Sequence, residues 1–224
     1  MPGRNIILAN NETYHIFNRG IASQLVFFNK RDYKRALETI FYYQNKNTSI
    51  KYSKFLKLSI SERSDLLEKL RKRKDWLVEI ISYCLMPNHF HLLLKQLVDN
   101  GISKFMGDLT NSYTRYINTK QERNGPIFEG KFKSVRIETE EQLLHVNRYA
   151  HLNPYTGYLV KTFEDLETYP YSSFPEYIGE YDSDFCSKDI ILGNFKNISS
   201  YKKFIFDQAD YQRQLANIRH LLFE

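Results

Sequence analysis

The chain has 224 residues, of which 42% are hydrophobic and 26% are charged. These values are ordinary for a globular domain with an extension and exclude a disordered or fibrous chain. No uncharged apolar stretch approaches the roughly 20 residues that a membrane span needs, which excludes an integral membrane protein. The first residues show no cleavable signal pattern and the chain has only two cysteines, so we expect a protein of the reducing cytoplasm.

Basic charge is concentrated in one part of the chain, whose net charge is +6. Residues 51–74 hold nine Lys or Arg against three Asp or Glu, whereas residues 138–185 hold ten acidic residues against two basic ones. A concentrated basic region attracts a polyanion, and the 17 Tyr and 16 Phe are candidate stacking surfaces for unpaired bases. The alternative is a solvated helix end and a core rich in aromatic residues, and composition leaves both open.

The first part of the chain predicts a strand, a helix and an inserted segment. Residues 12–19 alternate polar residues with aromatic and β-branched ones and then meet Gly20, as is typical of a strand. Residues 31–45 carry apolar side chains at the spacing of one helix face. We interpret residues 48–74 as a basic insertion that becomes helical at Ser61, its expected N-cap.

The middle of the chain predicts a buried hairpin followed by a long helix. Residues 76–86 have the length and β-branched content of a buried strand, Pro87-Asn88 breaks it, and residues 89–95 continue as a second strand. Residues 101–120 keep helical apolar spacing over about five turns.

A further strand and a capped helix follow. Residues 127–137 alternate enough to predict a strand. Thr139 and Gln142 have the spacing of a capping box that opens a helix. We expect Pro154 to end this helix at about Asn153, because the residue before a proline is disfavoured in helical conformation.

The order of these elements predicts an α+β fold of the ferredoxin-like kind, a split β-α-β sandwich with an antiparallel sheet and helices on one face. Residues 155–185 are turn-rich, and residues 199–223 predict one or two further helices. We therefore divide the chain into a main domain of residues 1–175 and a C-terminal helical extension of residues 176–224.

Two histidines lie two positions apart on the predicted second strand of the hairpin. Because side chains at i and i+2 of a strand share a face, His89 and His91 present two imidazoles together while Phe90 points the other way. This pattern offers two nitrogen ligands to one divalent ion. The alternative is a hydrogen-bonded pair at the mouth of a hairpin, so a second element is needed to decide.

That second element is the predicted helix that begins after Thr139. His145, Tyr149 and Asn153 are spaced i, i+4 and i+8, so they share one stripe that displays a phenol and an amide together. A tyrosine hydroxyl is a poor nucleophile near neutral pH unless something activates it or the phosphate that it attacks, as a metal ion does. The alternative for Tyr149 is a core aromatic residue whose hydroxyl finds a partner.

Together these motifs resemble the single-tyrosine HUH transposases, and most closely the branch called REP-associated tyrosine transposases. The similarity extends over about residues 13–175. It is carried by the sequences MPNHFH at residues 86–91 and YAHLNP at 149–154, and by three further segments at residues 14–20, 125–134 and 171–174.

The resemblance implies a ferredoxin-like enzyme that cleaves and rejoins DNA strands. His89 and His91 would hold a divalent cation, Mg²⁺ or Mn²⁺, with Asn153 as the third ligand and Tyr149 as the nucleophile that forms a 5′-phosphotyrosine. Insertion-sequence transposases usually place Gln four residues after the tyrosine, whereas Asn153 matches the REP-associated branch.

Several other residues are weaker candidates. His15 either approaches the ion or pairs within the sheet. Tyr113 and Tyr116 have core spacing, which favours packing or DNA contact over attack. The candidate phosphate contacts are basic residues on motif-bearing strands, although such residues often simply face solvent: Arg19, Lys131, Lys133 and Arg136.

The resulting hypothesis is a bacterial-type, nucleoid-associated DNA endonuclease and strand transferase. Its expected substrate is single-stranded or hairpin DNA containing a palindromic repeat, and it would act as a monomer or homodimer. One alternative is a domesticated nucleic-acid-binding protein of the same fold without turnover. Another is a metal-dependent phosphodiesterase that uses water instead of Tyr149.

Overall fold

Four strands form a single antiparallel sheet in the order β2-β3-β1-β4, in a computed structural model that describes residues 7–181 and 183–210. In this order β1 and β2 run parallel with β3 between them, which is the split β-α-β arrangement. The predicted fold class is confirmed. The strands are β1 (Thr13–Arg19), β2 (Val78–Met86), β3 (His89–Gln96) and β4 (Lys133–Arg136).

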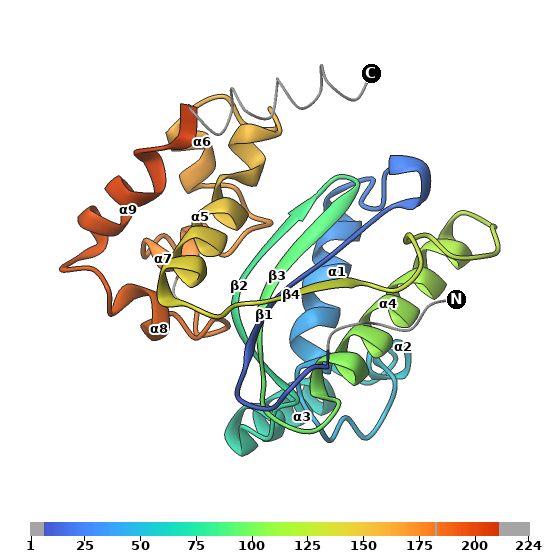
Figure 1. The fold of residues 1–224 in the computed structure, drawn as a ribbon. Helices are drawn as coiled ribbons and strands as arrows, with labels where there is room; N and C mark the ends of the chain where they lie inside the picture. The colour runs from blue at the N-terminus through green and yellow to red at the C-terminus, as the bar shows by residue number, and fades with distance from the viewer. Residues whose placement is uncertain (1–6, 182, 211–224) are drawn as a thin grey trace.

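Helices cover both faces of this sheet, rather than one face as expected from the sequence (Figure 1). Helices α1 and α4 pack on one face, and α5 with the helices that follow it lies on the other. The reason is that β2 and β3 are buried along nearly their whole length, so both of their faces need a cover. The helices concerned are α1 (Lys30–Tyr43), α4 (Gly101–Lys120), α5 (Glu140–Thr156), α6 (Phe163–Glu167), α7 (Phe174–Tyr177), α8 (Asp189–Leu192) and α9 (Ile198–Phe206).

Strand β1 shows how alternation divides the two faces. Tyr14 and Ile16 are fully buried toward α1 and α4, while His15 and Phe17 point to the opposite face. The long predicted helix, α4, has the expected bounds, and its Tyr113 is almost fully buried, with its hydroxyl donating to the carbonyl of Val26. The face of the sheet that carries His15 is therefore the one covered by α5.

The basic insertion forms two helices, α2 (Tyr52–Phe55) and α3 (Ile60–Arg73). The N-cap of α3 is Ser59, not Ser61 as expected. The Ser59 hydroxyl accepts from the Glu62 amide, and the Glu62 carboxylate accepts from the Ser59 amide, so Ser61 falls inside the first turn. Leu70 is the one buried side chain of α3, which otherwise faces solvent.

Strand β4 is shorter than the predicted strand of residues 127–137. Gly125 and Gly130 both have positive φ, a backbone conformation that interrupts a strand. Between these glycines, Phe128 forms an isolated bridge with Gly20. The segment before Lys133 is therefore a turn-rich loop, and β4 is a short edge strand.

The C-terminal part of the described chain shares the core of the sheet. Ile191, Tyr201 and Ile205 are fully buried in the same hydrophobic cluster as the strands. Helix α9 confirms the first helix predicted within residues 199–223, and residues 211–223 lie outside the described part. Among the residues described, none of the helices combines the length and apolar character needed to cross a bilayer.

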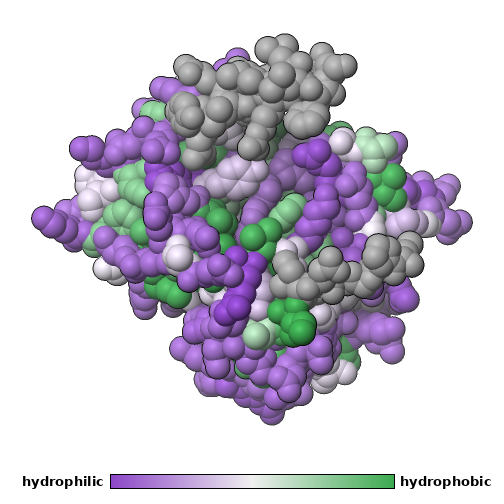
Figure 2. Space-filling model, in the orientation of Figure 1, coloured by the Kyte–Doolittle hydropathy of each residue, from purple (hydrophilic) through white to green (hydrophobic). Residues whose placement is uncertain are grey.

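The visible surface is predominantly hydrophilic, with apolar patches separated by polar side chains (Figure 2).

Candidate active site

The paired histidines lie on β3 next to the tight turn at Pro87-Asn88. Their ring centroids are 5.0 Å apart, and Phe90 points to the opposite face, where it packs edge-on against Phe128. The side chain of Asn88 orients His89, because the His89 Nδ1–H donates to Asn88 Oδ1 at 2.6 Å. This tautomer leaves the lone pair of His89 on Nε2.

His15 on β1 holds the second histidine from the neighbouring strand. Its Nε2 lies 2.9 Å from His91 Nδ1, and the two rings stack with centroids 5.1 Å apart. His15 therefore pairs within the sheet, which was the simpler of the two interpretations of this residue. When the His91 Nδ1–H is the donor, the lone pair of His91 also lies on Nε2.

All three imidazoles are neutral at physiological pH. Burial lowers the pKa of His15 to about 4. Burial, reinforced by the positive charge of Arg19, lowers the pKa of His89 to about 4, and burial takes the pKa of His91 well below its ordinary value. A neutral imidazole is the form that binds a metal ion.

Helix α5 brings a phenol and an amide to these histidines. The Tyr149 ring lies edge-on to His91 with centroids 5.2 Å apart, and 42% of Tyr149 is exposed. Asn153, one turn further on, is buried, and its Nδ2 donates to the carbonyl of Tyr149. The Asn153 side chain lies beside His89 and partly offsets the effect of burial on the pKa of that imidazole. The four residues singled out from the two motifs therefore converge within one chain.

Helix α5 does not end at Asn153 as expected, but continues through Pro154 to Thr156. The helical hydrogen bonding resumes at Gly157, whose amide donates to the Asn153 carbonyl. Tyr155 is buried, and its hydroxyl donates to Asp210, so tertiary contacts override the local effect of the proline. As a result Asn153 lies inside the helix rather than at a frayed end.

His145 does not share the site with Tyr149 and Asn153. Its ring lies 3.6 Å from a Glu141 carboxylate oxygen and close to the guanidinium of Arg148. Eight residues of an α-helix span about 12 Å, so His145 lies too far along α5 from Asn153 to reach the same site.

A buried polar network that the sequence analysis missed anchors α5. His151, with no exposed surface, places Nδ1 2.7 Å from the Tyr201 hydroxyl and Nε2 2.8 Å from the Ser173 hydroxyl. Tyr201 in turn donates to Asn147, and Ser173 accepts from the Tyr83 amide on β2. The network ties α5, the helix that carries Tyr149, to the sheet edge and to α9.

The same network accounts for the segment of residues 171–174. The Leu85 amide donates to the carbonyl of Tyr171, and the Ser173 amide donates to the carbonyl of Tyr83, so this segment pairs along the open edge of β2. In the sequence, this network could have been predicted only from the presence of His151 within YAHLNP and of two serines within the segment of residues 171–174.

The candidate phosphate contacts do not all lie on the histidine face. Lys133 is opposite Phe17 in the register of β1 and β4, and Arg19 is opposite His89, so both share that face. Arg136 is opposite Tyr14, on the other face, and its guanidinium pairs with Glu12 at 2.9 Å. Lys131 is exposed just before β4.

The donor set fits a divalent cation in one specific respect. His91 Nε2 is buried and has no hydrogen-bond partner, an arrangement that leaves a polar atom unsatisfied unless a ligand occupies the site. His89 Nε2 and the Asn153 amide oxygen supply further lone pairs. Among the described residues there is no group of three or more His, Cys, Asp or Glu side chains placed to hold an ion.

Tyr113 and Tyr116 on α4 do not reach the site formed by these histidines. Tyr113 is 1% exposed within the opposite helix layer, and Tyr116 donates its hydroxyl to Asp32 at 2.8 Å. Both therefore pack, as expected.

Comparison with known proteins gives one family and one shared fold. A solved structure described as a REP-associated tyrosine transposase bound to a REP hairpin matches with a TM-score of 0.57 and 13% identity, over 84% of this chain and 94% of that one. No curated protein sequence matches. The model of the family "Transposase IS200 like" matches residues 11–153. This match covers more than half of the sequence and includes both histidines, Tyr149 and Asn153, so the chain belongs to the IS200-like transposase family.

Proposed function

We propose that this protein nicks and rejoins single-stranded DNA through a covalent bond between Tyr149 and the 5′-phosphate. The observation that carries the proposal is the position of the Tyr149 ring, 5.2 Å from the His91 ring and delivered by a helix of the same chain. Because Tyr149 and the two histidines meet within one chain, the proposed reaction can take place in a monomer, and a homodimer of such sites remains the alternative.

The residues that would hold a divalent cation, Mg²⁺ or Mn²⁺, are His89, His91 and Asn153. Such an ion would supply Lewis-acid polarisation of a phosphate oxygen. Imidazole nitrogen also suits Zn²⁺, so the choice of a harder ion depends on the amide oxygen and on the substrate's own oxygens.

The chain's residues account for the remaining steps. The Tyr149 oxygen attacks phosphorus, the bond from phosphorus to the 3′ oxygen breaks, and the leaving strand takes up a proton to become a 3′-hydroxyl. The phenol proton passes to solvent, to which Tyr149 is partly exposed. Rejoining reverses these steps when a 3′-hydroxyl attacks the phosphotyrosine and releases the phenol. The proposed role of the His151 network is to keep α5 in place through both halves.

The substrate that we propose is DNA with a hairpin formed by a palindromic repeat. The support is the description of the structural neighbour, which is bound to a REP hairpin, together with the shared fold. Arg19 and Lys133 lie on the same sheet face as the histidines and are the proposed contacts to the strand being cut. Lys131 is exposed just before β4 and remains a further candidate, whereas Arg136 is occupied by Glu12.

A covalent adduct tests the nucleophile. Wild-type protein incubated with Mn²⁺ and a labelled hairpin that carries single-stranded flanks should give a protein–DNA band on a denaturing gel. Tyr149→Phe should give no adduct and no cleavage while it still binds the hairpin. The control is Tyr158→Phe, which removes another exposed phenol nine residues away and should leave the adduct intact.

The same gel separates the two rival functions. A water-using phosphodiesterase would cleave DNA without an adduct and would keep cleaving in Tyr149→Phe. A domesticated binding protein would bind the hairpin and neither cleave nor form an adduct under any metal condition. EDTA should abolish the wild-type adduct, and added Mn²⁺ should restore it.

A further inference from the structure

A second polar groove lies on the other side of the molecule from the histidines. Helix α1, residues 48–56 of the insertion and helix α4 enclose a groove of about 1220 Å³. We call it the α1–α4 groove. The sheet lies between this groove and Tyr149, since α1 and α4 cover one face and α5 the other (Figure 1).

Basic side chains dominate the lining of the α1–α4 groove. Seven Lys or Arg line it against two acidic residues, Glu38 and Asp108. Some of these bases are paired with carboxylates: Lys34 with Glu38, Lys104 with Asp108, and Lys120 with Asp32. Within residues 7–181 and 183–210, no ion pair is formed by the other four bases, which are Arg31, Arg35, Lys51 and Arg115.

Arg35 is the unusual member of this set, because it is buried. Only 8% of Arg35 is exposed, and its guanidinium lies 4.3 Å from the centroid of the Tyr52 ring and 5.3 Å from that of Tyr116. Its Nε has no hydrogen-bond partner. Burial lowers the pKa of Arg35. Cation–π contacts stabilise a guanidinium but do not neutralise it, and none of the ion pairs among the described residues includes Arg35.

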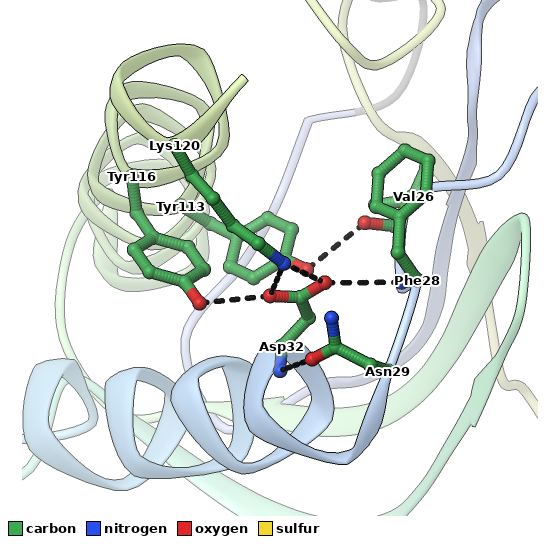
Figure 3. A network of polar contacts seen from close by, with 7 residues as sticks. All are labelled: Val26, Phe28, Asn29, Asp32, Tyr113, Tyr116 and Lys120. Carbon is green, nitrogen blue, oxygen red and sulfur yellow. Dashed lines mark hydrogen bonds and ion pairs between the residues drawn. The ribbon is translucent and has the colours of Figure 1, made fainter.

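Glu38 acts on Arg35 from the same helix without an ion pair between them, and it already accepts from the Tyr52 hydroxyl and pairs with Lys34. The oxygens of Asp32, also on α1, are saturated by other donors (Figure 3). Asp32 is fully buried and accepts from the Phe28 amide, from the Tyr116 hydroxyl, and from Lys120 Nζ through both oxygens. This network holds the Tyr116 ring on which Arg35 stacks. The groove thus has a hydrogen-bonded floor that presents a guanidinium without an ion pair.

The chemistry that matches this lining is a chain of phosphates. A phosphodiester accepts hydrogen bonds from the planar fork of an arginine, and several phosphates in a row would meet bases spread over two helices and the insertion. A single phosphate would use only one of the four unpaired bases.

We propose that the α1–α4 groove binds the sugar–phosphate backbone of DNA, with Arg35 as the buried anchor and Arg31, Lys51 and Arg115 around it. This inference rests on the proposed function. Because the sheet separates the groove from Tyr149, the phosphates bound there are not the one being cut. They belong to the stem of the hairpin or to the single strand that flanks it.

The proposal also assigns roles within the basic insertion. Lys51 lies in the groove, whereas α3 carries its basic residues on a solvent-facing surface outside it. Lys69 and Arg73 on α3 are exposed and do not line the groove, so they provide a control with the same charge change.

The test measures DNA binding as a function of salt, in EDTA. The groove variant is Arg31→Glu with Arg115→Glu, both at exposed positions, and the control is Lys69→Glu with Arg73→Glu. Two lost phosphate contacts should lower the slope of log K against log salt by about 1.8 for a duplex or about 1.4 for a single strand. The control pair should change the slope by less than half as much.

Two labelled probes identify the source of the phosphates: a blunt hairpin without flanks and a single-stranded oligonucleotide without a stem. A loss confined to one probe assigns the groove to that part of the substrate, and a loss with both assigns it to the backbone that they share. Arg35→Gln, with its folding checked by circular dichroism, should weaken the same probe. Wild-type affinity and slope in the groove variant with both probes, or an equal loss in the control, would overturn the proposal.

Failure of this proposal can be told apart from failure of the proposed function. An intact Tyr149 adduct together with unchanged binding by the groove variant overturns the groove alone. Groove-dependent binding without any adduct in the wild-type protein overturns the strand-cleavage proposal alone.

Discussion

Replacement of His151 tests whether the buried network holds α5, the helix that carries Tyr149, in place. His151 is fully buried, and its two ring nitrogens contact Tyr201 and Ser173 at 2.7 and 2.8 Å. In His151→Leu, Tyr201 keeps Asn147 as its partner and Ser173 keeps the Tyr83 amide, so neither hydroxyl is left without a hydrogen bond. The loss is therefore that of two hydrogen bonds of about 1 kcal/mol each, or about 2 kcal/mol of unfolding free energy.

His151→Ala provides the matched comparison, because it loses the same hydrogen bonds and also leaves a cavity. Its cost should exceed that of leucine by at least about 1 kcal/mol, in line with large-to-small changes in protein cores. For a chain of this size, 2 kcal/mol corresponds to a fall of about 4–8 °C in the midpoint of thermal unfolding.

The assay is urea unfolding at pH 7.5 in EDTA, followed by circular dichroism and by the fluorescence of Trp76, the only tryptophan. The adduct assay, run on the same samples below their unfolding midpoints, reports the position of Tyr149. The argument fails if His151→Leu is as stable as the wild-type protein, or if leucine costs as much as alanine. An unchanged rate of adduct formation in both variants would show that the network stabilises the fold without positioning Tyr149.

Three further predictions concern a buried ion pair, a buried histidine and two surface arginines. A double-mutant cycle of Asp32→Asn and Lys120→Met should give a coupling energy of about 1–3 kcal/mol in urea unfolding. The coupling is expected because the Asp32 side chain is fully buried and the Lys120 side chain is only about one-third exposed, so water screens the pair weakly. Purely additive effects of the two substitutions would contradict a stabilising ion pair. Burial lowers the pKa of His151 to about 3, so its stabilising effect is complete above the unfolded value near 6.5 and is lost as the pH falls toward 3. Between pH 6.5 and 4.5 in EDTA, the unfolding free energy should fall by about 2 kcal/mol from this residue alone, and His151→Leu should lose that part of the acid dependence. Finally, Arg19→Ala should weaken binding of the cleaved strand, measured by fluorescence anisotropy, more than Arg136→Ala does. The reason is that the guanidinium of Arg136 is already paired with Glu12. The reverse order would rule out Arg19 as the contact.

Local sequence chemistry was sufficient to locate most of the sheet and the long helix, and to single out the residues of the candidate active site. The alternation of β1 and the helical spacing of α4 each depend on neighbours in the chain, and both elements appear where those patterns predict. The spacing of His89 and His91 on a strand likewise places both rings on one face without reference to the rest of the fold.

Contacts between distant segments decided the rest. Pro154 should have ended α5, but the buried Tyr155 and its bond to Asp210 hold the last turn in helical form. The pairing of Arg136 with Glu12 removed one candidate contact, and neither residue's type reveals the other as its partner.

His15 and His151 likewise show the difference between what the local sequence predicts and what contacts between distant segments decide. Each histidine is visible in the sequence, but its hydrogen-bond partner lies 76 or 50 residues away in the chain. A side chain's type and its spacing from its neighbours determine what chemistry it offers and which face of its own element it occupies. Only packing of the sheet between two helix layers determines that the imidazoles meet the phenol on one face, while an unpaired guanidinium is buried on the other.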